Sequence, residues 1–113
     1  MNDHSTLIAA SDDYPVHQAQ VIAAQLKDAG ADIERAGMVS HDLMRAIRDA
    51  GLTKICQPAR FGGLELSLLT CYEVIKTLGC GCASTAWCTA IGATSNWGLV
   101  TFPEQAQRDV WAE

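Results

Sequence analysis

The chain has 113 residues and a formal net charge of −5, which suits a single domain. Its hydrophobic content of 49% and charged content of 19% are typical of globular proteins and exclude a disordered chain. The eight basic residues form no cluster, so the acidic balance argues against a nucleic-acid-binding surface.

The N-terminal segment 1–14 is polar and is predicted to be a flexible lead-in. It lacks the basic and apolar regions of a secretory signal peptide. The longest uncharged stretch, 77–103, holds too many Gly, Ser, Thr and Asn residues for a convincing membrane span. We therefore expect a cytoplasmic protein with no membrane partner.

The five cysteines do not form a pattern that indicates disulfides or a metal. Their odd number and the lack of a signal peptide favour reduced thiols that pack as small hydrophobes. The spacing of Cys80, Cys82 and Cys88 matches no zinc motif, and no His lies nearby. No metal site is expected.

The first predicted helix covers residues 15–36. Pro15 suits the first turn, and apolar residues then recur at three- and four-residue spacing as far as Ile33. Gly37 is a good terminator, whereas Gly30 either weakens the helix or marks a close helix crossing.

The second predicted helix is capped by Ser40 and stopped by Gly51. The connection 52–67 then contains Pro58, which breaks any helix, and Gly62-Gly63, whose backbone is free to adopt positive φ. We expect a loop with anchored sides there, and we treat its Phe61-Gly62-Gly63 turn as structural.

Three further helices complete the prediction. One is capped by Ser67, another begins near Ser84, and the last begins at Pro103. No period-two run indicates a strand, so the chain is predicted to be an all-α bundle of about five helices. The helix after Ser67 has a predicted buried side of Leu68, Leu69, Cys71, Tyr72, Ile75 and Leu78.

The segment 80–97 has the most unusual composition, because it has no charged residue and carries two tryptophans. Such a helix is expected to be covered by protein or ligand on most sides. Two interpretations of its tryptophans stay open: ordinary core aromatics, or the wall of a pocket. One face of this helix carries Ser84, Trp87, Ile91 and Ser95.

The order of these segments resembles the N-terminal helical domain of the acyl-CoA dehydrogenase fold, over about residues 15–113. The motifs that carry the resemblance are ERAGMVS, AGL and PARFGGLE, followed by STAW and FPEQAQRDVW. The last two are most similar to the two-component flavin-dependent monooxygenases, which include aromatic hydroxylases. The family's β-barrel and C-terminal helical domains have no counterpart in this sequence, so we expect no complete flavin site in it.

The resemblance implies a monooxygenase that uses reduced FMN or FAD, supplied by a flavin reductase, to hydroxylate a small organic substrate. The complete enzyme would be a homotetramer. Trp87 and Ser84 would contact the flavin. The substrate would be bound by Ser84, Trp87, Ile91, Ser95 and Asn96.

No catalytic residue is predicted in this chain. Some hydroxylases of this type carry a His in the segment that corresponds to residues 93–97, and this sequence has none there. A neutral hydroxyl can hydrogen-bond a substrate but cannot act as a base near neutral pH. An acyl-CoA dehydrogenase proper, which oxidises a thioester, and a non-catalytic helical module remain alternatives. Arg60 is expected to be solvated, and pairing with Glu65 or contact with the rest of the enzyme are the alternatives.

Overall fold

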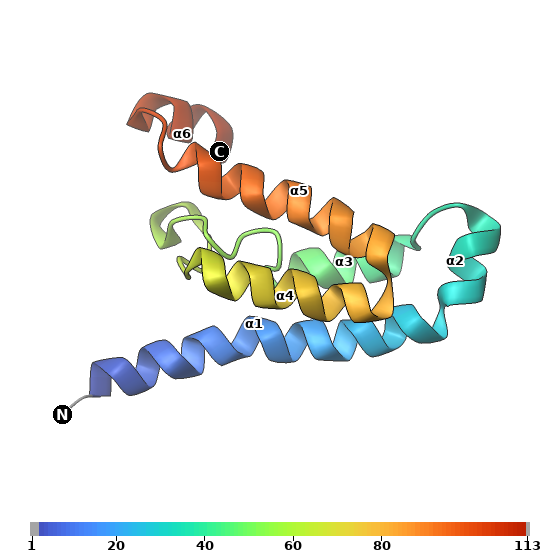
Figure 1. The fold of residues 1–113 in the computed structure, drawn as a ribbon. Coiled ribbons are helices and arrows are strands. Elements are labelled where there is room, and N and C mark those ends of the chain that lie inside the picture. The colour runs from blue at the N-terminus through green and yellow to red at the C-terminus, as the bar shows by residue number, and fades with distance from the viewer. Residues whose placement is uncertain (1–2, 113) are drawn as a thin grey trace.

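The computed structural model describes residues 3–112, with side chains from residue 13 onward. Every regular element in this part of the chain is helical, which confirms the predicted all-α class. Six α-helices and one short 3₁₀ helix are present, in the order shown in Figure 1: α1 (Asp3–Asp28), α2 (Gly30–Ala36), α3 (His41–Asp49), η1 (Ala59–Phe61), α4 (Leu68–Gly81), α5 (Ala83–Leu99) and α6 (Glu104–Trp111).

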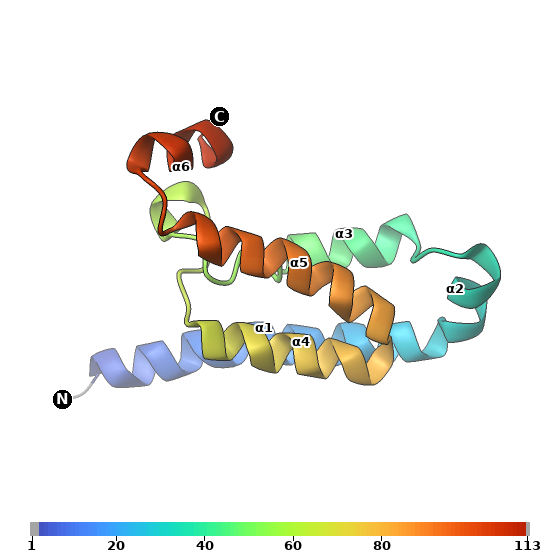
Figure 2. The same ribbon diagram turned by 45° about the horizontal axis from the view of Figure 1, so that its top comes forward.

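Helix α4 lies along α1, and α5 folds back across α4 (Figures 1 and 2). Helix α3 also contacts α1. Leucine, isoleucine and valine side chains from α1, α3, α4 and the connection before α4 form one core. The largest of these fully buried apolar side chains are Leu26, Ile47, Leu52, Ile55, Val74 and Leu78.

The predicted helix caps are confirmed. The Ser40 hydroxyl accepts a hydrogen bond from the Leu43 amide, and the Ser67 hydroxyl accepts one from the Thr70 amide, both at 3.2 Å. Gly37 ends α2 with a left-handed φ of 73°, the conformation for which glycine pays no steric penalty. Short polar side chains therefore fix where these helices begin, as their positions in the sequence indicated.

The predicted helix start at Pro15 is wrong, because α1 begins at Asp3 and carries Pro15 in its interior. An interior proline removes one helical hydrogen bond and costs about 3 kcal/mol. The Pro15 side chain is fully buried, so its packing offsets part of that cost. Of the predicted lead-in, residues 1 and 2 and the side chains of residues 3–12 lie outside what the structure describes.

The long first helix divides at Ala29, which is why six α-helices are found instead of about five. Gly30 marks this weak point and not a close crossing, since a Cβ there would meet no atom within 4 Å. The close crossing is at Gly81, where a Cβ would lie 2.3 Å from the carbonyl oxygen of Ala23. The missing side chain at Gly81 lets the end of α4 touch the backbone of α1.

The connection 52–67 is a loop with anchored sides, as predicted. The Leu64 amide donates to the Lys54 carbonyl at 3.0 Å, and the Leu66 amide donates to the Ile55 carbonyl at 2.7 Å. Gly62 adopts a φ of 86°, which supports the structural role expected for the turn around it.

Two predicted side-chain positions in α4 are wrong. Leu69 is 74% exposed and Tyr72 is also exposed, whereas Cys71 and Leu78 are buried. Helix α4 is covered by α1 and α5 but not on its remaining side, so apolar residues there stay in solvent. Among the described residues, no helix is both long and apolar enough to cross a membrane.

Candidate functional site

Helix α5 presents one exposed, uncharged face, which we call the α5 stripe: Ser84, Trp87, Ile91 and Ser95. These four residues share one face, as their spacing predicted. Within this chain the stripe is uncovered, because Trp87 is 68% exposed and Ile91 is 52% exposed, so the covering by protein or ligand expected for most sides of the helix is not supplied here on this face. Trp97 is exposed as well, so neither tryptophan of this helix is a core aromatic within this chain.

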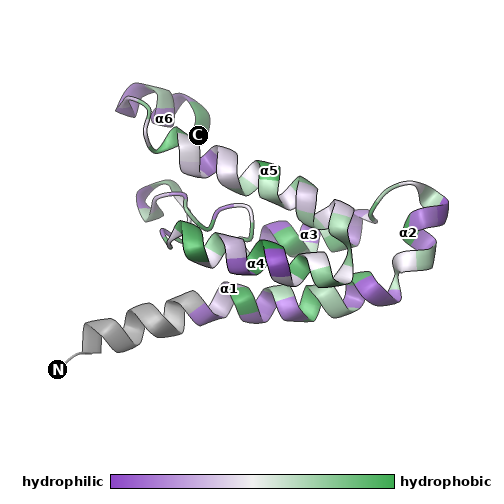
Figure 3. Ribbon diagram, viewed as in Figure 1, coloured by the Kyte–Doolittle hydropathy of each residue, from purple (hydrophilic) through white to green (hydrophobic). Residues whose placement is uncertain are grey.

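The opposite side of α5 explains why the bulky residues face outward. Ala86 and Ala93 are buried there, and their small side chains let α5 approach α4 closely. The Thr89 hydroxyl, also buried, donates to the Thr85 carbonyl at 2.9 Å and so needs no solvent. Figure 3 shows α5 in pale colours along most of its length, because small and hydroxyl-bearing residues dominate it.

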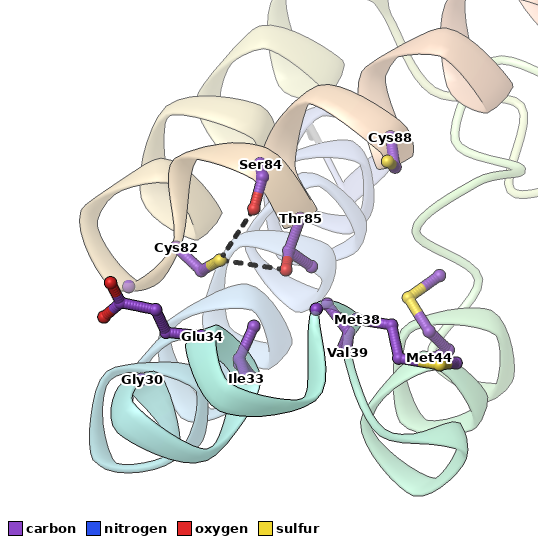
Figure 4. A pocket seen from close by; sticks show the side chains of 12 residues that line it. Gly30, Ile33, Glu34, Met38, Val39, Met44, Cys82, Ser84, Thr85 and Cys88 are labelled. Carbon is purple, nitrogen blue, oxygen red and sulfur yellow. Dashed lines mark hydrogen bonds between the residues drawn. The ribbon is translucent and has the colours of Figure 1, made fainter.

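A cavity of about 690 Å³ lies at the first turns of α5, between α5, α2 and the segment that leads into α3. We call it the α2–α5 cavity (Figure 4). Most of its wall is apolar, and Ser84 belongs both to this wall and to the α5 stripe. Its lining residues are Gly30, Ile33, Glu34, Gly37, Met38, Val39, Met44, Gly81, Cys82, Ser84, Thr85 and Cys88.

Cys82 is the N-cap residue of α5, and its thiol is hydrogen-bonded to the second and third residues of the helix, Ser84 and Thr85. The Ser84 Oγ lies 3.4 Å from the Cys82 Sγ, and the Thr85 hydroxyl donates to that sulfur at 3.1 Å (Figure 4). These contacts, Ser84 first, lower the pKa of the Cys82 thiol, because hydrogen bonds stabilise the thiolate.

The chemistry available to the stripe is limited by its composition. It contains no carboxylate, imidazole or amine, and Glu34 is the one charged residue of the adjoining cavity wall. Hydroxyl groups and an aromatic ring can bind, orient and shield a ligand, but they cannot remove a proton near neutral pH. In the described residues, no group of three His, Cys, Asp or Glu side chains is arranged to hold a metal ion.

Asn96 was predicted to join the substrate-binding residues, but its side chain is directed at the connection 52–67 and α6 and does not belong to the α5 stripe. Its Nδ2 donates to the Thr53 carbonyl at 2.7 Å, and its Oδ1 accepts from the Trp111 indole N–H at 3.1 Å. Both polar ends of Asn96 are therefore engaged by protein. The residue ties α5 to α6 and to the connection 52–67, which supports a structural role.

A second cleft, also of about 690 Å³, is more polar and lies between the connection 52–67 and the end of α6. Arg60, which borders it, is half-exposed, forms an ion pair with Glu104 and donates to Gln107 Oε1 at 3.1 Å, so the alternative pairing with Glu65 is not formed. The Glu65 carboxylate instead accepts from the Ala59 amide at 3.0 Å. Arg60, and then Arg108, hold the pKa of the Glu104 carboxyl below its usual range.

Two residues of functional interest were not singled out from the sequence. One is Met44, which lies in the cavity wall. The other is Gln107, which is buried and donates to the carbonyls of Val100 and Phe102 at 3.1 and 2.9 Å. Met44 could not be found from a local pattern, because the other wall residues lie on elements distant in the sequence, and the Gln107 contact with Arg60 likewise joins residues 47 positions apart.

Comparison with known proteins gives a consistent picture. The sequence profile described as acyl-CoA dehydrogenase, N-terminal domain, matches residues 17–113. The oxygenase subunit HsaA of a flavin-dependent monooxygenase from Rhodococcus jostii is 30% identical over 86 residues, which are 76% of this chain and 22% of the relative. The oxygenase component of the FADH(2)-dependent resorcinol hydroxylase from Rhizobium sp. is 33% identical over 92 residues, or 81% of this chain and 22% of the relative.

The structural comparison agrees with the sequence relatives. The crystal structure of 3-HSA hydroxylase from Rhodococcus sp. RHA1 superposes with a TM-score of 0.80 and 27% sequence identity. The match covers 91% of this chain and 27% of that one. The chain thus spans between a fifth and a quarter of the length of these curated relatives.

Proposed function

The chain belongs to the acyl-CoA dehydrogenase N-terminal domain family, and we propose that it forms one wall of the substrate cavity of a flavin-dependent monooxygenase. The curated relatives named above, which are oxygenase subunits or components, support this assignment. The reaction proposed is the insertion of one oxygen atom from O₂ into a small organic substrate. A flavin reductase would supply the reduced flavin, and the complete enzyme would be a cytoplasmic homotetramer.

The observation that carries the proposal is the open α5 stripe. An exposed tryptophan one turn from an exposed isoleucine, flanked by serines and free of charge, is costly to leave in water. Ligand cavities have this composition: apolar and aromatic walls with a few oriented polar groups. Other parts of the enzyme would complete the cavity over this face.

The residues of the stripe fit one side of a flavin ring. The Trp87 indole offers an uncharged aromatic surface, and the Ser84 hydroxyl offers one hydrogen-bonding group beside it. The stripe has no Lys or Arg, so the phosphate of FMN or the pyrophosphate of FAD would be held elsewhere. When bound, the reduced flavin supplies the electrons that activate O₂.

The role of the protein at this wall is positional. We propose that Trp87 and Ile91 exclude water from the substrate and that the Ser95 hydroxyl orients a polar group on it. Asn96 would hold this end of α5 in place through Thr53 and Trp111 instead of contacting the ligand. Any proton that must leave the substrate would go to a group outside the stripe.

The experiment uses the full gene product that contains this chain. It is mixed with reduced FMN or reduced FAD and ¹⁸O₂ in the presence of a panel of small phenols, and products are analysed by mass spectrometry. A product that has gained one ¹⁸O atom supports the proposal. The flavin that gives the higher rate of product formation is identified as the cofactor. In a parallel assay with acyl-thioesters and oxidised flavin as the electron acceptor, thioester oxidation without oxygen incorporation would show a dehydrogenase instead, and no reaction with phenols or thioesters would favour a non-catalytic module.

A further inference from the structure

The α2–α5 cavity is continuous with the α5 stripe. Ser84 and Cys88 line the cavity and lie one helical turn apart, and Ile91 and Ser95 follow along α5. A ligand that lies along the stripe therefore reaches the mouth of the cavity without crossing any other element. Figure 4 shows Ser84, Cys88 and the side chains of α2 around this space.

The wall of the cavity selects for an apolar ligand. Ile33, Val39 and Met44 are partly buried and pack against the core, so they form an apolar floor. Four sulfur-containing side chains also line it, from Met38, Met44, Cys82 and Cys88. Methionine side chains adapt to irregular shapes, and sulfur makes favourable contacts with aromatic rings.

The charge of the wall excludes an anion. The single charged lining residue is Glu34, and no Lys, Arg or His borders the space. The three glycines in the wall, Gly30, Gly37 and Gly81, leave room that side chains would otherwise take. A volume of about 690 Å³ lies within the range of small-molecule sites.

We propose that the α2–α5 cavity binds an uncharged apolar group of the substrate, such as an alkyl chain or a second ring, while the reacting part lies along the α5 stripe. This assignment rests on the proposed function and narrows the substrate class. The enzyme acts on a molecule that carries a hydrophobic substituent remote from the position that is oxygenated. Single-ring compounds without such a substituent are poor substrates.

The binding test uses this chain and needs no flavin. The probes are 4-methylphenol, 4-butylphenol and 4-hexylphenol, and the readout is the ¹³C-methyl NMR signals of Met38 and Met44 in methionine-labelled protein. Affinity rises with chain length, by about fourfold for each methylene that becomes fully buried. Both methyl signals shift with the longer probes. Equal affinity for all three probes, or unchanged methionine signals, would overturn the proposal.

A matched pair of variants separates the cavity from general surface binding. Cys88→Phe fills the cavity mouth and lowers the affinity for 4-hexylphenol at least tenfold. Cys80→Phe adds the same side chain at another exposed cysteine, outside the cavity wall, and leaves that affinity unchanged. Met44→Ala, which removes a wall side chain, provides a second perturbation if Cys88→Phe does not fold. Equal effects of the two phenylalanine variants would contradict the cavity assignment.

The two proposals fail in different ways. Chain-length-dependent binding without any ¹⁸O incorporation by the gene product would support the cavity and overturn the monooxygenase. Oxygen incorporation with a rate and KM that do not depend on the length of the alkyl chain would support the monooxygenase and overturn the cavity assignment.

Discussion

Gly81 lies against Ala23 so closely that a Cβ at position 81 would be 2.3 Å from the Ala23 carbonyl oxygen and 2.9 Å from the Ala23 Cα. The end of α4 thereby touches the backbone of α1. The turn from α4 into α5 follows at Cys82, so this contact also sets where α5 begins. The position of the α5 stripe therefore depends on a residue that has no side chain.

Replacing Gly81 by alanine should destabilise the fold, by about 2 kcal/mol or more in the free energy of unfolding. The new methyl group would meet backbone atoms, which cannot move aside as a flexible side chain can. Urea denaturation followed by circular dichroism measures the change. Gly98→Ala is the matched control, because a Cβ there meets nothing within 4 Å. Alanine at position 98 should leave the free energy of unfolding unchanged or raise it by up to about 1 kcal/mol. A similar loss of stability in both variants would contradict the close contact between α4 and α1 at Gly81.

Asn96→Ala should destabilise the chain by about 1–3 kcal/mol, because it leaves the Thr53 carbonyl and the Trp111 indole N–H without their partners. Thermal unfolding of the variant measures the loss. Ser95→Ala removes an exposed hydroxyl from the next position and should change stability by less than about 0.5 kcal/mol. If the two variants were equally stable, Asn96 would not hold α5 to its neighbours.

The Cys82 thiol should be alkylated at lower pH than an ordinary cysteine, because its pKa is lowered by hydrogen bonds from Ser84 and Thr85. The thiolate is the reactive form, and a lowered pKa populates it at lower pH. In a Cys80→Ser, Cys88→Ser background, Cys82 is the accessible thiol, since Cys56 and Cys71 are buried. The rate of alkylation by iodoacetamide, measured as a function of pH, gives the midpoint of the titration of Cys82.

Ser84→Ala should shift the midpoint of the alkylation curve to higher pH, because it removes the largest of the contributions that lower the pKa of Cys82. Ser95→Ala, in the same helix but away from the sulfur, should leave the midpoint where it is. An identical midpoint in the Ser84 variant and its parent would show that the hydroxyl does not act on this thiol.

Burial of Cys71 raises its pKa to about 11, with the neighbouring Cys56 adding to the effect. Cys71 should therefore resist alkylation at pH 8 in the folded chain and react once urea unfolds it. Mass spectrometry of tryptic peptides measures the labelling of Cys71 in the folded chain and in the urea-unfolded chain. Rapid labelling of Cys71 in the native chain would show that the contact between α4 and the connection 52–67 opens easily.

Local features of the fold could be predicted because they depend on neighbouring residues. Ser40 and Ser67 cap the helices that follow them, and Gly37 ends α2, as their positions in the sequence indicate. The exposure of Leu69 and Tyr72 could not be predicted, since it depends on which side of α4 the other helices cover. The close approach of Gly81 to Ala23 likewise depends on the crossing of two helices.

The candidate site could be predicted in part for the same reason. The spacing of Ser84, Trp87, Ile91 and Ser95 places them on one face, and the structure confirms this. Asn96 follows Ser95 directly in the chain, but its side chain turns to partners 43 and 15 residues away. The α2–α5 cavity unites residues from separate helices, so no segment of the sequence indicated it.

The most direct test of the central claim compares two exposed apolar residues in the full gene product supplied with reduced flavin and O₂. Trp87→Ala should lower the rate of substrate-dependent oxygen incorporation at least tenfold, because Trp87 lies on the α5 stripe. Leu69→Ala, which shortens a similarly exposed apolar side chain on α4, should leave that rate within about twofold. Both variants should unfold at the temperature of the parent. If Trp87→Ala retained the full rate, the α5 stripe would not be a wall of the substrate cavity.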